Sequence, residues 1–339
     1  MIMNRMKVDI QSIISHEELF LPLKHSTILV TGATGFIGSM LIKSLIEAKK
    51  TYDGLDLKII GQIRNLEKAE NVFNECLGSF DLSLTDDVLC DYIIHTVSPT
   101  TSKYFIEHPV ETIKASVEST MSSLEIARKN KASMVYLSSM EQYGVPYETG
   151  QIMTEDKIGI IDHLSIRSSY SESKRLCECL CASYASEYGV NVKIARLAQT
   201  FGAGISLSDN RMPMQFARAV LEKKDIILHT HGKSMSNFVY LTDAINAILL
   251  LIDKGNAGEA YNVCNDRETR SVFEIASLVA DEIAKRMINV KIDENPNMGY
   301  APENTMRLNS DKLYSLGWVP CVSMKEAYKR LVSYLSENS

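Results

Sequence analysis

Apolar segments of strand length alternate with longer helical patterns through the first two thirds of the chain. The strand-like segments are TILVTG, LKIIGQI, DYIIHTV, SMVYLSS and NVKIARL, and helical patterns cover about 37–49, 110–129 and 170–187. Nearly continuous apolar strands that alternate with helices are typical of a parallel sheet covered on both faces. Because crossovers between parallel strands are right-handed, the sequence predicts a doubly wound α/β sheet of the Rossmann type.

The pattern changes after about residue 200. Helical segments around 214–222, 242–253 and 272–285 are separated by short strands such as AYNV, and LGWVP precedes a final helix. We predict two units in the chain. A dinucleotide-binding Rossmann domain would comprise residues 1–200 and about 226–258, and a smaller C-terminal α/β lobe for substrate would comprise about 201–225 and 259–339.

The composition is typical of a globular, enzyme-sized protein of the cytoplasm. The 339 residues are 45% hydrophobic, which is enough for a large core. The 36 basic and 42 acidic residues give a net charge of −6, which does not favour nucleic-acid binding. No apolar run approaches the ~20 residues that span a bilayer, and the N-terminus lacks the apolar region of a secretory signal. We therefore expect neither a nucleic-acid nor a membrane partner.

The cysteines and histidines do not predict a metal site. The segment CECLC places Cys177, Cys179 and Cys181 on a predicted helix. Alternate residues of a helix point in different directions, so three thiolates there cannot converge on one ion. The pair His229 and His231 has no acidic or cysteine partner at ligand spacing. We expect free thiols and no metal.

A glycine-rich turn follows the first predicted strand and opens the first helix. The segment ILVTGATGFIGSMLI has the spacing G-x-x-G-x-x-G rather than G-x-G-x-x-G. Such a turn lets the backbone approach a pyrophosphate, which N–H groups at the helix N-terminus can bind. The glycines could instead only shape the turn, but their place between strand and helix favours dinucleotide binding. The predicted cofactor-binding residues are Gly32, Thr34, Gly35, Phe36, Ile37 and Gly38, with Thr96 after a later strand.

The end of the second predicted strand bears on the choice between NAD and NADP. An acidic residue there would bind the ribose 2′-hydroxyl of NAD, whereas an arginine accommodates the 2′-phosphate of NADP. In IIGQIRN, Ile63 stands where the acid is expected and Arg64 follows it. The sequence therefore favours NADP over NAD, and the alternative is that Arg64 is a solvated loop residue.

The segment RSSYSESKR places Tyr170 and Lys174 four residues apart, on one face of a predicted helix. A free tyrosine has a pKa near ~10 and is a poor base at neutral pH. A nearby ammonium group, together with a cationic nicotinamide, would favour the phenolate and lower that pKa. The spacing therefore predicts a tyrosine that transfers protons, and the alternative is a coincidental pair on a helix surface.

Together these motifs resemble the extended short-chain dehydrogenase/reductases, in the NAD-dependent epimerase/dehydratase group. TGATGFIG is similar to the glycine motif of the group, YLSSMEQYG to the strand with its catalytic serine or threonine, and YSESK to its Y-x-x-x-K. RLAQTFG, FVYLTDAINAI and LGWVP resemble later landmarks in the same order, so that the resemblance covers about residue 26 to the end. The resemblance implies a Rossmann domain, a C-terminal substrate lobe, a nicotinamide dinucleotide and, commonly, a homodimer. It also implies that Ser139 binds the reacting oxygen, that Tyr170 exchanges its proton, and that Lys174 holds the nicotinamide ribose.

The residues after Ser139 depart from part of the family. Dehydratases carry an Asp-Glu pair at this place, whereas this chain has Met140 and Glu141, so a 4,6-dehydratase is disfavoured. A glutamate here, together with R-x-x-Y-x-E-x-K-R, resembles the UDP-glucuronate decarboxylases. We predict that Glu141 is a second catalytic acid or base, and the alternative is an ion-pair partner.

Two further departures concern the nucleotide end of the substrate. Ser236 replaces the arginine that usually binds the diphosphate, and Gln199 replaces the usual asparagine of the family. We predict that Gln199 contacts the substrate and that Arg307, in MRLNSDKL, supplies a diphosphate contact.

These observations leave three functions open. The first is an enzyme that transiently oxidises a nucleotide-activated sugar at a ring carbon, epimerises or decarboxylates it, and returns the hydride. The second is an NADPH-dependent reductase of a sugar phosphate or related carbonyl, which Arg64 and Ser236 favour. The third is a non-catalytic dinucleotide-sensing protein, since fold alone does not imply catalysis. Sensing requires none of Ser139, Tyr170 and Lys174, and their presence argues against it.

Overall fold

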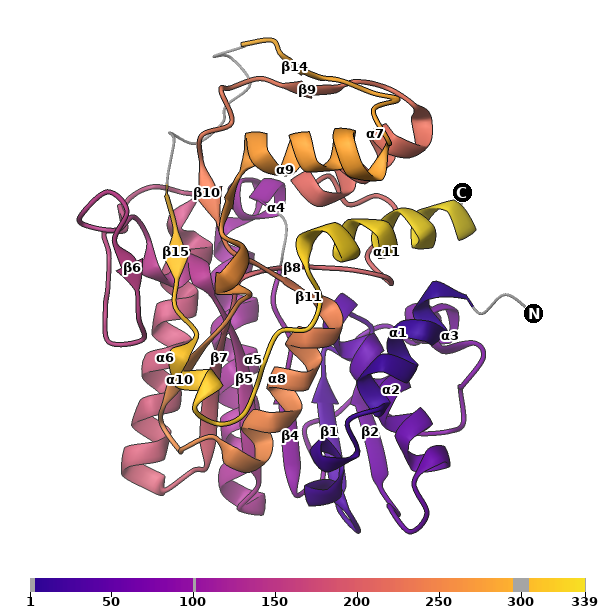
Figure 1. Cartoon of the computed structure of the whole chain (residues 1–339). Helices are drawn as coiled ribbons and strands as arrows, with labels where there is room; N and C mark the ends of the chain where they lie inside the picture. The colour runs from indigo at the N-terminus through magenta and orange to yellow at the C-terminus, as the bar shows by residue number, and fades with distance from the viewer. Residues whose placement is uncertain (1–3, 100–101, 295–304, 339) are drawn as a thin grey trace.

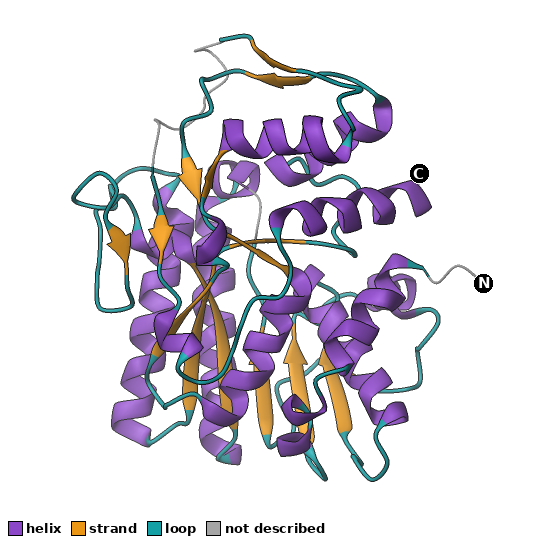
Figure 2. Ribbon diagram, viewed as in Figure 1, coloured by secondary structure: helices purple, strands orange, loops and turns teal. Residues whose placement is uncertain are grey.

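The computed structural model describes residues 4–99, 102–294 and 305–338. At its centre lies a parallel sheet of seven strands (Figures 1 and 2). The strands are β1 (Thr27–Thr31), β2 (Lys58–Gln62), β3 (Asp81–Ser83), β4 (Tyr92–His95), β5 (Ser133–Ser139), β7 (Val192–Leu197) and β12 (Ala260–Val263). Their order is β12-β7-β5-β4-β1-β2-β3. The chain runs outward from β1 to β3 and returns to β4 on the other side of β1, which confirms the predicted doubly wound sheet.

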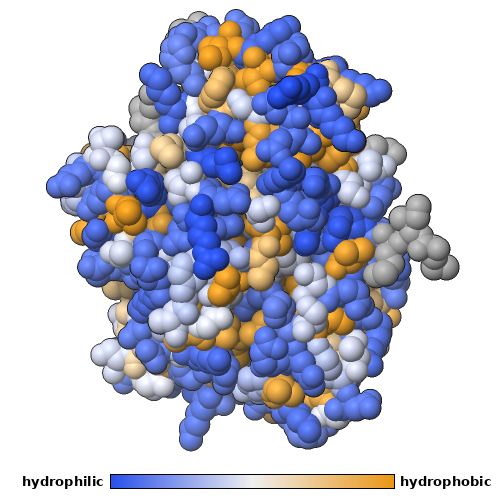
Figure 3. Space-filling view, in the orientation of Figure 1, coloured by the Kyte–Doolittle hydropathy of each residue, from blue (hydrophilic) through white to orange (hydrophobic). Residues whose placement is uncertain are grey.

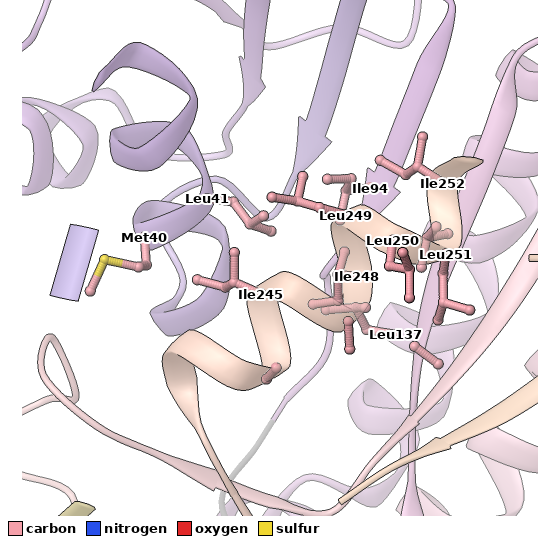
Figure 4. Close-up of a cluster of buried hydrophobic side chains, with 14 of the residues drawn as sticks. Met40, Leu41, Ile94, Leu137, Ile245, Ile248, Leu249, Leu250, Leu251 and Ile252 are labelled. Atoms are coloured by element: carbon pink, nitrogen blue, oxygen red, sulfur yellow. The ribbon is translucent and has the colours of Figure 1, made fainter. Parts of the chain in front are cut away.

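Helices cover both faces of this sheet. On one face α5 (Pro109–Asn130) packs against α6 (Ser168–Tyr188), and on the other lie α1 (Arg5–Ile14), α2 (Phe36–Thr51) and α8 (Leu241–Lys254). Almost all residues of α8 are buried, as expected for a helix that is apolar around its circumference. Figure 4 shows side chains of α8 in one cluster with residues of α2, β4 and β5.

A second, smaller core lies beyond the carboxyl ends of the strands, at the top of Figure 1. Phe201, Phe216 and Tyr328 are buried in it. Its helices are α7 (Met212–Glu222), α9 (Val272–Leu278), which continues into a π-helical turn over Val279–Ile283, and α11 (Met324–Glu337). The short strands pair as β9 (Ile226–Leu228) with β14 (Val290–Ile292), β10 (Met235–Ser236) with β13 (Arg270–Ser271), β8 (Gln199–Phe201) with β11 (Phe238–Tyr240), and β6 (Ile152–Met153) with β15 (Arg307–Leu308).

Two strands lie on the other side of the predicted domain boundaries. β12 was assigned to the lobe, yet it forms the edge of the main sheet beside β7. β9 was assigned to the Rossmann domain, yet it pairs with β14 in the lobe. Both segments are too short for their sequence to identify the sheet that they join. The division into two functional units stays a prediction.

Several short elements carry no strong sequence pattern and were not predicted. They are α1, β3, α3 (Leu66–Phe73), α4 (Ser102–Glu107) and α10 (Asp311–Tyr314).

The two ends of the chain meet at a buried carboxylate. Asp9 of α1 is fully buried and pairs with Arg5 at 2.8 Å and with Arg330 of α11 at 3.2 Å. The hydroxyl of Tyr240 donates to the other oxygen of Asp9 at 2.5 Å. In addition, the backbone N–H of Arg5 donates to Glu337 at 2.8 Å. The first and last helices are therefore fastened to each other and to the end of β11.

Polar residues cover most of the face seen in Figure 3, where apolar residues form small groups. Within residues 4–99, 102–294 and 305–338, no helix is both long enough and apolar enough to cross a membrane.

Candidate active site

The glycine-rich turn connects β1 to α2 next to the end of β4. Gly32 has a φ of +66°, and a Cβ there would lie 2.8 Å from Oγ1 of Thr96. A Cβ at Gly38 would lie 2.5 Å from the carbonyl oxygen of Gly32, so both positions require glycine. Thr96 donates from Oγ1 to the carbonyl oxygen of Thr31 at 2.7 Å. The predicted cofactor residue Thr96 therefore also shapes the turn.

The N-terminus of α2 has the geometry of an anion site. Its N-cap, Gly35, is exposed, and no side chain in the described part of the chain caps this helix. The first N–H groups of a helix have no acceptor within the helix, and the helix dipole favours a negative charge there. Thr34 lies in the turn, while Phe36 and Ile37 are partly buried at the start of α2. This arrangement fits the pyrophosphate of a dinucleotide, and the individual roles stay predictions.

Arg64 lies in the loop after β2. Its side chain is exposed, and it forms no hydrogen bond to the residues that the structure describes. By contrast, Ile63 is buried, and its N–H donates to the carbonyl oxygen of Ser83 at 2.9 Å. The guanidinium can therefore bind an anion at this edge of the sheet, and its role in cofactor choice stays a prediction.

Tyr170, in the first turn of α6, lies beside Ser139, the last residue of β5. The hydroxyls of Ser139 and Ser98 lie close enough to the phenol to act on its pKa. Tyr170 is only 8% exposed, and the ring of Phe105 stacks on it with centroids 4.3 Å apart. Burial and then the charge of Glu141 raise the pKa of Tyr170 to about 12, while the serine hydroxyls act to lower it. The side chains of the protein thus keep this phenol protonated at neutral pH.

Lys174 lies one turn further along the same face of α6. Its Nζ is 5.8 Å from the ring centroid of Tyr170 and 4.9 Å from that of Tyr136, and it donates to the carbonyl oxygen of Leu137 at 2.7 Å. Burial lowers the pKa of Lys174 to about 8. The expected lowering of the pKa of Tyr170 involves both Lys174 and a cationic nicotinamide. Among the protein groups alone, burial and the charge of Glu141 leave this pKa raised, so the joint effect stays a prediction.

Glu141 lies in the 3₁₀ turn η3 (Met140–Tyr143), directly after β5. Its N–H donates to Oγ of Ser139 at 3.2 Å, and its Oε2 is 3.7 Å from Nη2 of Arg167. Although 37% of the Glu141 side chain is exposed, surrounding protein desolvates the carboxyl and raises its pKa, against the effect of Arg167. A carboxyl in this state can exchange protons closer to neutral pH than a solvated one. The catalytic and the ion-pair interpretation of Glu141 are therefore compatible.

Four side chains near Tyr170 were not predicted from the sequence. Ser98 and Phe105 follow β4, Arg167 precedes α6, and Arg211 precedes α7 and acts electrostatically on Tyr170. Two of the four have a signal that reasoning from sequence could use. Arg167 is the first arginine of R-x-x-Y-x-E-x-K-R, and Ser98 follows a strand of the sheet. The carboxyl ends of neighbouring parallel strands meet at one edge of the sheet, so polar residues after β4 and β5 are expected to lie together.

Two of the departures from the family pattern contact each other. The hydroxyl of Ser236, on β10, lies 3.9 Å from the sulfur of Met140, which is buried. Gln199 is exposed at the start of β8, and Arg307 is exposed on β15, opposite Ile152. Within the described chain no hydrogen bond connects either residue to Tyr170, and their substrate roles stay predictions.

Below the site, His95 at the end of β4 is fully buried. Its Nδ1 lies 2.7 Å from the hydroxyl of Thr31 and 2.9 Å from that of Ser123, and its ring stacks on Tyr136. Burial and then the charges of Lys174 and Arg64 lower the pKa of His95 to about 3. This histidine is a neutral part of the core that joins β1, β4 and α5.

The described residues contain no group of three or more His, Cys, Asp or Glu side chains that can hold a metal ion. The seven cysteines are free thiols, and Cys177 and Cys181 are buried residues of α6. His229 and His231 lie in the lobe, where His231 pairs with Glu294 at 3.2 Å.

The sequence and the fold resemble those of known proteins. The model of the "NAD dependent epimerase/dehydratase family" matches residues 28–264. UDP-glucuronic acid decarboxylase 1 of Danio rerio is 28% identical over 313 residues, which cover 91% of this chain and 72% of that protein. A solved UDP-glucuronic acid 4-epimerase from Bacillus cereus, in complex with UDP-glucuronic acid and NAD, has a TM-score of 0.76 at 20% identity and covers 92% of this chain and 100% of its own. RMD from Pseudomonas aeruginosa, complexed with NADPH, has a TM-score of 0.72 at 20% identity and covers 93% and 100%.

Proposed function

The chain belongs to the NAD dependent epimerase/dehydratase family, and from this membership we propose that it modifies a nucleotide-activated sugar by transient oxidation at a ring carbon. The observation that carries the proposal is the cluster of Ser139, Tyr170 and Lys174 beside the glycine turn at the carboxyl edge of the sheet. A dinucleotide on this turn would supply the hydride acceptor and donor. The relative from Danio rerio makes UDP-glucuronic acid the first substrate to test.

Tyr170 transfers the proton of the reacting hydroxyl in this proposal. Its pKa of about 12 makes the phenol a proton donor in the protein alone. A cationic group close to the ring favours the phenolate, and in this proposal the nicotinamide is that group. Ser139 orients the oxygen that gains or loses the proton, because its hydroxyl lies beside the phenol and acts on its pKa.

Glu141 acts as the second acid or base. It lies on the turn that follows Ser139, and its charge is strong enough at Tyr170 to raise the pKa of the phenol. A second acid is suited to protonate the ring carbon that is left as a carbanion after loss of carbon dioxide. Epimerisation by transient oxidation does not require it, because one phenol can remove and return the hydroxyl proton while the ketone turns its other face to the dinucleotide. The residue before Glu141 is Met140, which has no proton to give, so elimination of water is disfavoured.

Arg64 supports NADP as the cofactor over NAD. Its exposed guanidinium at the end of β2 matches the place of a 2′-phosphate, and no acid stands at Ile63. The solved neighbours include one with NAD and one with NADPH, so this fold accommodates both.

A plain NADPH-dependent reductase of a sugar phosphate is the second candidate. Arg64 favours it, and so does Ser236, which offers no cation to the diphosphate of a nucleotide sugar. Mass spectrometry of the dinucleotide that co-purifies with native protein separates the two candidates. Tightly held oxidised cofactor supports internal recycling of the hydride, and an empty site supports the reductase.

The substrate is tested by incubating the protein with UDP-glucuronic acid and following the products by liquid chromatography and mass spectrometry. A decarboxylase gives a UDP-pentose, lighter by carbon dioxide, and a 4-epimerase gives an isomer of unchanged mass. If neither product forms and the protein instead consumes NADPH to give a reduced product, the reductase becomes the favoured function.

We further propose a homodimer, as the resemblance implies, and a cytoplasmic location, as the composition and the N-terminal sequence led us to expect. The apolar side chains of Val110, Ile113 and Met121 on α5 and of Leu176 on α6 are all more than 40% exposed. Since α5 and α6 lie side by side, two copies of this pair would bury these residues in a four-helix interface. Light scattering is expected to give twice the monomer mass, and Ile113→Lys is expected to give the monomer.

A further inference from the structure

The turn η3 sets the place of Glu141, and two arginines hold this turn. It begins at Ser139, whose Oγ accepts the N–H of Glu141, and it ends at Gly144, which has a φ of +70°. A turn of four residues has little regular structure of its own to fix it, so its position depends on contacts with its neighbours.

Arg175 of α6 supplies one set of contacts. Its Nε donates to the carbonyl oxygen of Gln142 at 2.7 Å. Its Nη2 donates to the carbonyl oxygens of Tyr143 at 3.0 Å and Gly159 at 2.8 Å. These are charge-assisted hydrogen bonds, which are stronger than neutral ones, and the planar fork of the guanidinium fixes their geometry. Arg175 directly follows Lys174, so the helix that carries the catalytic pair also holds the turn.

The second set of contacts comes from a buried ion pair. Arg196 of β7 pairs with Glu178 of α6 at 2.7 Å and donates from Nη1 to the hydroxyl of Tyr143 at 2.8 Å. The hydroxyl of Ser138 donates to Glu178 at 2.5 Å. The side chain of Tyr143 thus holds the end of the turn independently of Arg175. Loss of Arg175 is therefore expected to loosen the turn without releasing it.

We propose that Arg175 is a positioning residue, which holds the turn η3 so that the carboxyl of Glu141 stays beside Ser139 and Tyr170, where it can act on the substrate. The proposal rests on the proposed function, in which Glu141 is the second acid or base. Among the described residues, the hydrogen bonds of Arg175 go to the backbone of the turn, at Gln142 and Tyr143, and to the loop at Gly159. We therefore infer that it acts through Glu141 rather than on the substrate.

A double-mutant cycle tests this action. The variants Arg175→Met, Glu141→Gln and the double variant are assayed for kcat and KM. Misplacement of a reacting group by about 1 Å costs on the order of a hundredfold in rate, so Arg175→Met is expected to lower kcat by roughly ten- to a hundredfold. In the double variant the loss is expected to be about that of Glu141→Gln alone, because residues that act as a unit are not additive. Losses that multiply would overturn the proposal.

Two controls separate positioning from general damage. Arg128→Met removes an exposed arginine of α5 that pairs with Glu125, and it is expected to leave kcat unchanged. In Arg175→Met, the limb of the kcat/KM pH profile that belongs to Glu141 is expected to shift to lower pH, because a loosened turn hydrates the carboxyl. The KM of the dinucleotide is expected to stay within a factor of a few, and an unshifted limb would contradict the proposal.

Hydrogen exchange measured by mass spectrometry tests the hold without any substrate. Arg175→Met is expected to speed exchange in 140–160 and to leave α5 unchanged. Unchanged exchange in 140–160 would refute the proposal that Arg175 fixes the turn. If exchange is faster in Arg175→Met but the wild type turns over no nucleotide sugar, the proposed function is wrong while Arg175 still fixes the turn.

Discussion

The buried histidine below the site makes the stability of this protein sensitive to mild acid. His95 has a pKa of about 3 in the folded chain, against 6.5 for the free side chain. As the pH falls below 6.5, the unfolded chain takes up a proton at this position that the folded chain does not accept. Stability is therefore fully present above pH 6.5 and is lost as the pH falls toward 3.

The two pKa values give the size of the effect. Between pH 7.5 and 5.0 His95 is expected to remove about 2 kcal/mol from the free energy of unfolding, at 1.36 kcal/mol per pKa unit. The pKa of Lys174 is lowered to about 8, so its effect on stability changes between pH 8 and the pKa of free lysine, which lies above the range from pH 7.5 to 5.0. Carboxyls with raised pKa values, such as Asp9 and Glu141, act in the opposite sense, so the effect of His95 must be isolated by a variant.

The measurement compares wild type with His95→Gln by urea unfolding at several pH values. The only tryptophan, Trp318, is buried and provides a fluorescence signal, and circular dichroism checks that the transitions coincide. His95→Gln is expected to be less stable at pH 7.5, because it disturbs the contacts with Thr31 and Ser123. The difference between the two proteins is expected to shrink by about 2 kcal/mol at pH 5.0. A difference that stays constant within about 0.5 kcal/mol would refute the reasoning, because His95 would then titrate alike in both states.

Three further predictions concern the proposed chemistry. Tyr170→Phe is expected to lower turnover by ~10²–10⁴-fold with dinucleotide affinity nearly intact, and substantial turnover at neutral pH would contradict the assignment. Gly35→Val is expected to abolish dinucleotide binding in a folded protein. Among the described residues the close neighbour of a new Cβ is the carbonyl oxygen of Gly32 at 3.1 Å, and the side chain would lie in the pyrophosphate path. Calorimetric titration that finds unchanged affinity would place the phosphates elsewhere. Arg64→Ala is expected to weaken NADP by roughly ten- to a hundredfold and NAD by a factor of a few, since only NADP offers the phosphate. Equal losses in the two titrations would make Arg64 a structural residue.

The sequence predicted the sheet because five of its strands are long and nearly continuously apolar. The residues of β1, β4 and β5 cannot be solvated on either face, so their burial in a parallel sheet follows from composition. β3 has only three residues, and β12 has four that also fit a lobe strand. For such short segments the partner is decided by tertiary contacts and not by local pattern.

For the site, the sequence predicted residues that share one helix face or one turn. Tyr170 and Lys174 are neighbours by helix geometry alone, and the glycine turn follows from its spacing. Other contacts join segments that lie far apart in the chain, and no local pattern predicts them. Examples are the stacking of Phe105 on Tyr170 and the hydrogen bond from Arg175 to the carbonyl oxygen of Gln142. The raised pKa of Tyr170 also depends on burial, which a motif does not reveal.

The fastening of the first helix to the last has a consequence during synthesis on the ribosome. Asp9 leaves the exit tunnel early, whereas Arg330 is added 321 residues later. Until then one of its two arginine partners is missing, and a buried carboxylate that lacks a partner is costly. The nascent chain can form β1 to β5 while it is being made, but α1 is expected to dock last. A chain that stops before α11 would therefore expose α1 to proteases, although the sheet and the glycine turn are complete.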